Sequence, residues 1–166
     1  MAAGGLVYLN GAFLERAQAV VSVDDRGFVF GDGVYEVTRA IDGRLFERER
    51  HVARLKRSLA AIRIAIPDAE VDRLGDDVWH ELLRRNGIET GEALVYTQIT
   101  RGVAPRAHPF PPPGTASTIF ASVSPLALPT AVRARGARGI TVPDIRWARC
   151  NIKTVTLLPK DRKSVV

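Results

Sequence analysis

The first part of the chain alternates apolar and polar residues over short segments, a pattern typical of β-strands. Residues 6–10 and 13–15 are predicted to pair as a hairpin across a glycine-containing turn. Residues 34–41 form a stronger strand, and the aspartate-glycine pair after them favours a tight turn before residues 44–46. We therefore expect a β-meander in this part of the chain.

From residue 49 the apolar residues recur about every 3.6 positions, which is the period of a helix. The first stripe comprises Val52, Leu55, Leu59 and Ile62, and it ends before a proline. The second stripe comprises Val71, Leu74, Val78 and Leu82, and an asparagine-glycine pair suited to a helix C-terminus follows it. Residues 93–100 and 117–123 return to strand composition. The expected fold class is α+β, with an antiparallel sheet covered by two helices.

The segment between the last two strands has the sequence RGVAPRAHPFPPPG over residues 101–114. It is too long and too rich in proline for a simple hairpin turn, and long loops in compact domains are often functional. We therefore expect this loop to bind a ligand or a partner. Small residues and prolines after residue 124 indicate a linker, and a further strand is predicted near residues 139–142.

Composition narrows the classes of protein that this chain can represent. Its 166 residues are 46% hydrophobic and 25% charged, enough for one packed core and part of a second. A single cysteine and an N-terminus without a basic-then-apolar segment favour the cytoplasm. We expect no membrane association, because no apolar run approaches the roughly 20 residues needed to span a bilayer. The net charge of +6 comes from arginines dispersed among acidic residues, which argues against nucleic-acid binding.

Common independent motifs of catalysis are missing from the sequence. It has no P-loop and no G-x-S-x-G motif, and its three histidines show no metal-ligand spacing, so we expect no metal site. Four segments stand out in combination: DRGFVFGDGVYEVTR at 25–39, HVARL at 51–55, RGVAPRAHPF at 101–110 and DIRWARCNIKTVTLL at 144–158. In this order and spacing they resemble the fold-type IV pyridoxal-phosphate aminotransferases. The RAH sequence of the third segment is most similar to the D-amino-acid aminotransferase branch.

The resemblance implies a cofactor, pyridoxal 5′-phosphate, and a reaction, transamination between a D-amino acid and a 2-oxo acid. Lys153 matches the lysine that binds the cofactor aldehyde through its amine and carries the substrate α-proton, so it is the catalytic candidate. Arg54 matches the arginine that holds the cofactor phosphate, and its helix position turns it away from the apolar stripe. Taken without the resemblance, each would be an ordinary solvated side chain.

Three further residues match those with which D-amino-acid aminotransferases bind the substrate α-carboxylate: Tyr35, Arg106 and His108. A guanidinium, an imidazole and a phenol together suit a carboxylate, because they supply a fixed cation and neutral donors. In the family the loop residues come from the partner subunit, so the resemblance implies a homodimer. Read alone, Tyr35 would be a packed strand aromatic and the other two would be solvated loop residues.

The resemblance also predicts how the chain divides. Residues 1–122 match the small N-terminal domain, 123–130 a linker, and 131–159 the truncated start of the large cofactor-binding domain. Residues 160–166 do not resemble the family and are predicted to be a non-native tail. We therefore expect an N-terminal fragment with little activity of its own, whose apolar residues beyond the small domain are exposed: Ile145, Trp147, Val155 and Leu157.

Other readings stay open at this point. Within the same family, a branched-chain aminotransferase or an aminodeoxychorismate lyase is the alternative enzyme, and the RAH loop argues against both. A noncatalytic domain that keeps the small-domain fold and binds a partner or phosphorylated ligand is a reading from a different class of protein. Glu36 and Asp25 lie within the first segment, but the sequence assigns neither of them a role.

Overall fold

A computed structural model describes residues 5–139, 141, 143 and 150–157. These residues contain a six-stranded sheet in the order β2-β1-β6-β5-β3-β4, and every neighbouring pair is antiparallel. The strands are β1 (Leu6–Leu9), β2 (Ala12–Glu15), β3 (Gly33–Ile41), β4 (Arg44–Leu45), β5 (Glu92–Thr100) and β6 (Thr118–Pro125). The predicted α+β class and its antiparallel sheet are therefore confirmed. β6 runs two residues beyond the strand expected at 117–123, into the segment assigned to the linker.

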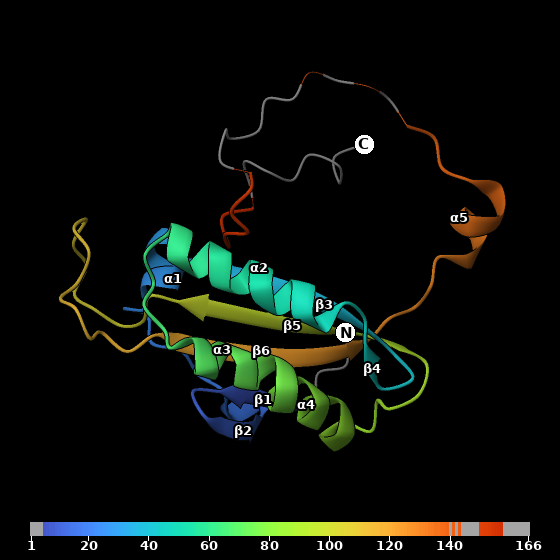
Figure 1. Cartoon of the computed structure of the whole chain (residues 1–166), viewed down its shortest axis with the longest axis horizontal. Coiled ribbons are helices and arrows are strands. Elements are labelled where there is room, and N and C mark those ends of the chain that lie inside the picture. The colour runs from blue at the N-terminus through green and yellow to red at the C-terminus, as the bar shows by residue number, and fades with distance from the viewer. Residues whose placement is uncertain (1–4, 140, 142, 144–149, 158–166) are drawn as a thin grey trace.

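Two helical rods lie across one face of this sheet (Figure 1). The first is α2 (Arg48–Ala61). The second consists of α3 (Asp68–Arg73), a π-helical turn η2 (Leu74–Val78) and α4 (Trp79–Arg85). Both predicted helices are therefore present, but the second contains a π turn that its apolar period did not indicate. Gly75 lies in that turn and permits close packing on α2, because a Cβ there would lie 2.6 Å from Cγ2 of Val52.

The sequence patterns missed three short helical elements: η1 (Arg16–Gln18), α1 (Arg26–Phe30) and α5 (Thr130–Arg135). α1 has only five residues, too few to display a helical period. It forms because the Asp25 side chain accepts the Gly27 amide at 2.7 Å and Gly31 ends the helix in the left-handed conformation. None of the helices described is long and apolar enough to cross a membrane.

The two faces of the sheet differ because successive strand residues point to opposite sides. The helix-covered face of β3 carries Val34, Glu36, Thr38 and Ala40, all of which are buried. The hydroxyl of Thr97 on β5 accepts the indole N–H of buried Trp79 at 2.7 Å, which ties the second rod to the sheet. On the other face Tyr35, Tyr96 and Phe120 form an aromatic row, with ring centroids 5.8 and 6.3 Å apart.

The C-terminal predictions are covered only in part. A strand was expected near residues 139–142. Residues 139 and 141 are described and are not in a strand, whereas residues 140 and 142 lie outside the described residues. Ile145 and Trp147, which were expected to be exposed, also lie outside them. Val155 is half-buried and Leu157 is exposed. α5 has no buried residue, and the structure does not test whether it opens a second domain.

Candidate functional site

Residues 150–157 return to the sheet and lie along the edge of β3. Thr154 forms an antiparallel bridge with Val34. The Tyr35 amide donates to the Lys153 carbonyl at 3.0 Å, and the Val155 amide donates to the Gly33 carbonyl at 3.1 Å. This pairing brings Lys153 beside the first half of β3, although more than a hundred residues separate them in sequence. In Figure 1 the red segment of the trace therefore stands next to α2.

Lys153 faces the aromatic row on the open side of the sheet. Its Nζ lies 3.9 Å from the centroid of the Tyr35 ring, close enough for a cation–π contact. Its backbone amide lies 3.4 Å from Oγ of Ser58 on α2. Two of the predicted site residues, Lys153 and Tyr35, are thus in direct contact.

Arg54 is held by a buried carboxylate that the sequence analysis left without a role. Its Nε and Nη2 donate to the two oxygens of Glu36 at 2.8 and 2.5 Å, a bidentate arrangement. Nδ1 of His51, one turn earlier on α2, lies 3.0 Å from the same carboxylate. The Glu36 side chain is 0% exposed, whereas that of Arg54 is 43% exposed. The carboxylate therefore fixes a guanidinium that is still open to solvent.

The charges in this cluster reinforce one another. Burial favours the neutral form of Glu36, but hydrogen bonds from Arg54, His51 and the Val37 amide outweigh it and hold the carboxyl pKa below its usual value. The hydrogen bond to Glu36 raises the pKa of Arg54. Arg54 is therefore a cation fixed by Glu36, the residue that follows Tyr35 on β3.

The arrangement fits the phosphate of a cofactor such as pyridoxal phosphate. Among the described contacts, no hydrogen bond occupies Nη1 of Arg54, so a guanidinium oriented by Glu36 has a donor group left for an anion.

Gly31 lies next to the returning segment, where a Cβ would come within 2.4 Å of Cγ2 of Thr156. A positive φ of 66° and this close approach both favour glycine at that position.

Arg106 and His108 lie elsewhere in this chain. The Arg106 guanidinium carbon is 5.4 Å from the centroid of the Phe30 ring, and the His108 ring is 6.0 Å from it, so both residues surround the end of α1. Both side chains are exposed. The described contacts join neither of them to Lys153 or Tyr35. The structure thus places Lys153 against Tyr35 and ties Arg54 to Glu36, the next residue on β3, while the two loop residues form a separate group.

Sequence reasoning missed Glu36 and His51 as parts of the site. A signal was available for Glu36, because it occupies an inward-facing position between Val34 and Thr38, and a carboxylate at a buried position needs a partner. His51 and Arg54 are three residues apart on α2, so both reach the same group.

Comparison with known proteins identifies the family of the chain. A sequence model of the class IV amino-transferase family matches residues 33–163. The chain therefore belongs to the class IV aminotransferase family, and the predicted resemblance is confirmed. The enzymes of this family depend on pyridoxal phosphate.

Among curated proteins, the chain is 43% identical to a D-alanine aminotransferase of Staphylococcus haemolyticus and 39% identical to one of Bacillus licheniformis. Each alignment covers 152 residues, which is 92% of this chain and 52% of the relative. The chain thus spans about half the length of the curated relatives it matches.

Solved structures share its fold. A branched-chain amino acid aminotransferase of Escherichia coli superimposes with a TM-score of 0.66 at 21% identity, over 74% of this chain and 40% of that one. The pyridoxal-phosphate-bound form of a hypothetical aminotransferase of Mycobacterium tuberculosis gives 0.60 at 27% identity, over 78% and 42% of the two chains.

Proposed function

We propose that the protein containing this chain uses pyridoxal phosphate to exchange the amino group of a D-amino acid with a 2-oxo acid. The single observation that carries the proposal is that Lys153, distant in sequence, pairs with β3 and contacts Tyr35, directly beside the residue that holds Arg54. The identity of 39–43% to D-alanine aminotransferases supports the D-amino-acid substrate class and D-alanine as the first amino donor to test.

Lys153, Tyr35 and Arg54 each have a distinct role in the proposal. Arg54, oriented by Glu36, holds the cofactor phosphate by charge-assisted hydrogen bonds. Lys153 would hold the cofactor through Nζ, and the same amine would move the substrate α-proton. Bound pyridoxal phosphate supplies an electron-withdrawing ring that stabilises the carbanion. The Tyr35 phenol donates a hydrogen bond to the substrate carboxylate.

Arg106 and His108 supply the cation and the second donor for that carboxylate. Their exposed positions around Phe30, apart from Tyr35 of the same chain, support a homodimer in which the loop of one subunit completes the site of the other. We propose that this chain without such a complete site catalyses little transamination, and that residues 1–122 form its small domain.

A chimera tests the proposal. Residues 1–157 are joined to the C-terminal half of the Staphylococcus haemolyticus D-alanine aminotransferase, and pyruvate formation from D-alanine and 2-oxoglutarate is measured. We expect activity with D-alanine, much less with L-alanine, and none after Lys153→Ala. A folded, cofactor-loaded chimera that prefers L-leucine would support a branched-chain enzyme instead, and one that transfers no amino group would contradict the proposal.

A further inference from the structure

Two arginines and one aspartate form a buried ionic cluster at the end of the sheet from which the 101–114 loop leaves. The side chains of Arg26, Asp32 and Arg101 are 5%, 11% and 9% exposed. Nε of Arg26 donates to Asp32 at 2.9 Å, and Nε and Nη2 of Arg101 donate to the same carboxylate at 2.7 and 2.8 Å. Two buried cations thus share one anion, so their remaining donors require other partners.

Those partners join the loop to the rest of the fold. Nη1 of Arg26 donates to the carbonyl of Ala107 at 2.8 Å and lies 3.4 Å from that of Pro109, the two residues that flank His108. Arg101 donates to the carbonyls of Ile62 and Arg63 at the C-terminal end of α2, at 2.7 and 2.8 Å. The cluster therefore fixes the middle of the loop to the helix that carries Arg54.

The two ends of the loop are also held together. Asp25, next to Arg26, accepts hydrogen bonds from the hydroxyls of Thr100 and Thr118 at 2.9 and 2.6 Å. Thr100 directly precedes the loop, and Thr118 lies shortly after it. A Cβ at Gly102 would lie 1.8 Å from the Ala116 carbonyl oxygen, so the two backbones pack directly against each other there. The two ends of the loop are therefore packed against each other where the loop leaves the sheet.

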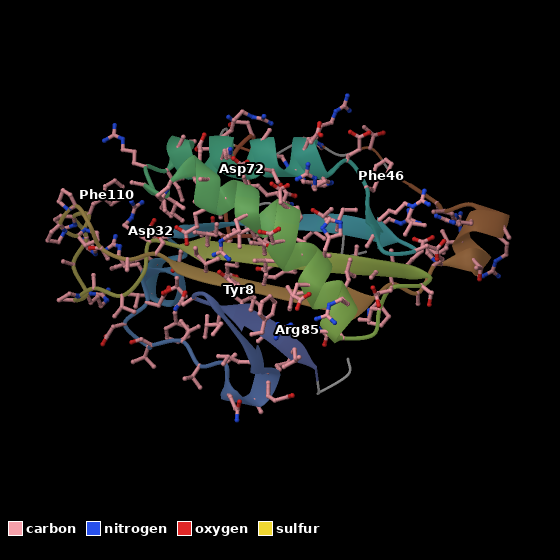
Figure 2. The ribbon with its side chains drawn as sticks, turned by 60° about the horizontal axis from the view of Figure 1, so that its bottom comes forward. Tyr8, Asp32, Phe46, Asp72, Arg85 and Phe110 are labelled. Atoms are coloured by element: carbon pink, nitrogen blue, oxygen red, sulfur yellow. The ribbon has the colours of Figure 1, made fainter. Side chains whose placement is uncertain are left out.

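Aromatic rings complete the support of the loop. Phe110 stacks on the Arg101 guanidinium, whose central carbon is 3.9 Å from the ring centroid. The Phe30 ring contacts two guanidinium groups: the central carbon of Arg26 lies 4.7 Å from its centroid and that of Arg106 lies 5.4 Å from it. Asp32 and Phe110 stand at the same end of the molecule in Figure 2.

We infer that Arg26 is a positioning residue that presets His108 and Arg106 for the substrate carboxylate, with Asp32 and Arg101 holding Arg26 in place. This inference rests on the proposed function, because it takes the loop to be the carboxylate-binding element. A planar guanidinium is required, since Nε bonds Asp32 while Nη1 bonds the loop carbonyls on the far side. A lysine ammonium at this position cannot bridge both groups.

The test follows the ring signals of His108 by NMR in this chain, with no ligand present. The edge contact between Phe30 and His108 gives the imidazole protons a ring-current shift and cross-peaks to Phe30. We expect Arg26→Lys to move the His108 signals to the positions of an unstructured histidine, while the Trp79 indole signal stays in place. The matched control is Arg85→Lys, because Arg85 also pairs with a carboxylate and stacks on an aromatic ring, Phe13, away from the loop. Unchanged His108 signals in folded Arg26→Lys would overturn the inference.

A second measurement needs no variant, so it tests whether the loop is anchored even if Arg26→Lys does not fold. Trypsin can cut the Arg106–Ala107 bond in the loop and the Arg133–Ala134 bond in the exposed helix α5. With rates normalised to the unfolded chain, we expect the loop bond to be cut at least about tenfold more slowly, because cutting requires local opening of the anchored loop. Equal rates would overturn the inference.

The functional consequence is read in the chimera described above. We expect Arg26→Lys to raise KM for D-alanine roughly tenfold and to leave kcat within about twofold, because it weakens a ground-state contact with the carboxylate. A fall in kcat at unchanged KM would overturn the inference. Because the NMR and cleavage measurements need neither cofactor nor substrate, their outcome separates a failure of this inference from a failure of the proposed function.

Discussion

The ammonium of Lys153 lies 3.9 Å from the centre of the Tyr35 ring, and the two residues are also joined by a backbone hydrogen bond of 3.0 Å. This relationship predicts how the returning segment is held. Tyr35→Leu removes a cation–π contact of about 1 kcal/mol, so amide exchange at Val155 should rise about fivefold. Tyr35→Phe keeps the ring and should leave exchange at the wild-type rate. Equal exchange in all three proteins would show that the ring does not hold the segment.

Arg54 should discriminate between cofactors with and without a phosphate. Losing a hydrogen bond to a charged group costs about 1.5–3 kcal/mol, so Arg54→Lys should weaken pyridoxal phosphate binding roughly 10- to 100-fold. The affinity for pyridoxal, which lacks the phosphate, should stay unchanged. Titration of the wild type and the variant with both compounds provides the measurement. An equal loss for both compounds would mean that Arg54 contributes through folding and not through the phosphate.

Glu36 should make stability depend on pH. Its pKa is held below the ordinary value of 4.5, so the ionised carboxylate stabilises the fold above that pH, and this contribution is lost as pH falls through the lower folded-state pKa. Glu36→Gln should cost roughly 1–3 kcal/mol at pH 7, and less as the pH falls below 4.5. Urea denaturation of both proteins at pH 7 and pH 3.5 measures the difference. A penalty that stays the same at both values would contradict the ionised pair.

The exposed segment after β6 should be the first to be cut by trypsin. Arg133, Arg135 and Arg138 are all exposed, and α5 has no buried residue. We expect an early product that ends in this segment and keeps the circular dichroism of the sheet and its helices, because the core lies in the preceding residues. Mass spectrometry of the time course identifies the cuts. A chain that resists cleavage here, or that is cut first at buried Arg101, would contradict the domain division.

Much of this fold could be predicted because its hydrophobic period changes where the structure changes. The apolar stripe of Val52, Leu55 and Leu59 predicted α2, and the alternation over residues 34–41 predicted β3. Five-residue α1 escaped detection because an aspartate cap and a left-handed glycine define it, and not a period. The π turn escaped detection because the apolar period continues through it, and the close packing of its Gly75 on α2 is a tertiary contact that the period does not indicate.

The site was predictable to a smaller extent. Lys153 and Tyr35 became candidates through the resemblance, and nothing in hydrophobic spacing indicated that residues so distant in sequence would pair. The buried position of Glu36 was visible in the strand pattern, but its partners on α2 follow only from the packing of helix on sheet. Ionic partnerships across elements, such as those of Asp32 with Arg26 and Arg101, depend on that same packing.

The most direct test of the central claim is covalent labelling of the purified chain. The protein is incubated with pyridoxal phosphate, its absorbance spectrum is recorded, the adduct is reduced with borohydride, and the labelled lysine is located by mass mapping. We predict labelling at Lys153 that is lost in Lys153→Ala and retained in Lys56→Ala. Lys56 is the control because its ammonium pairs with Asp72 at 2.7 Å. Labelling that is absent, or spread evenly over the lysines, would contradict a cofactor site at the edge of β3.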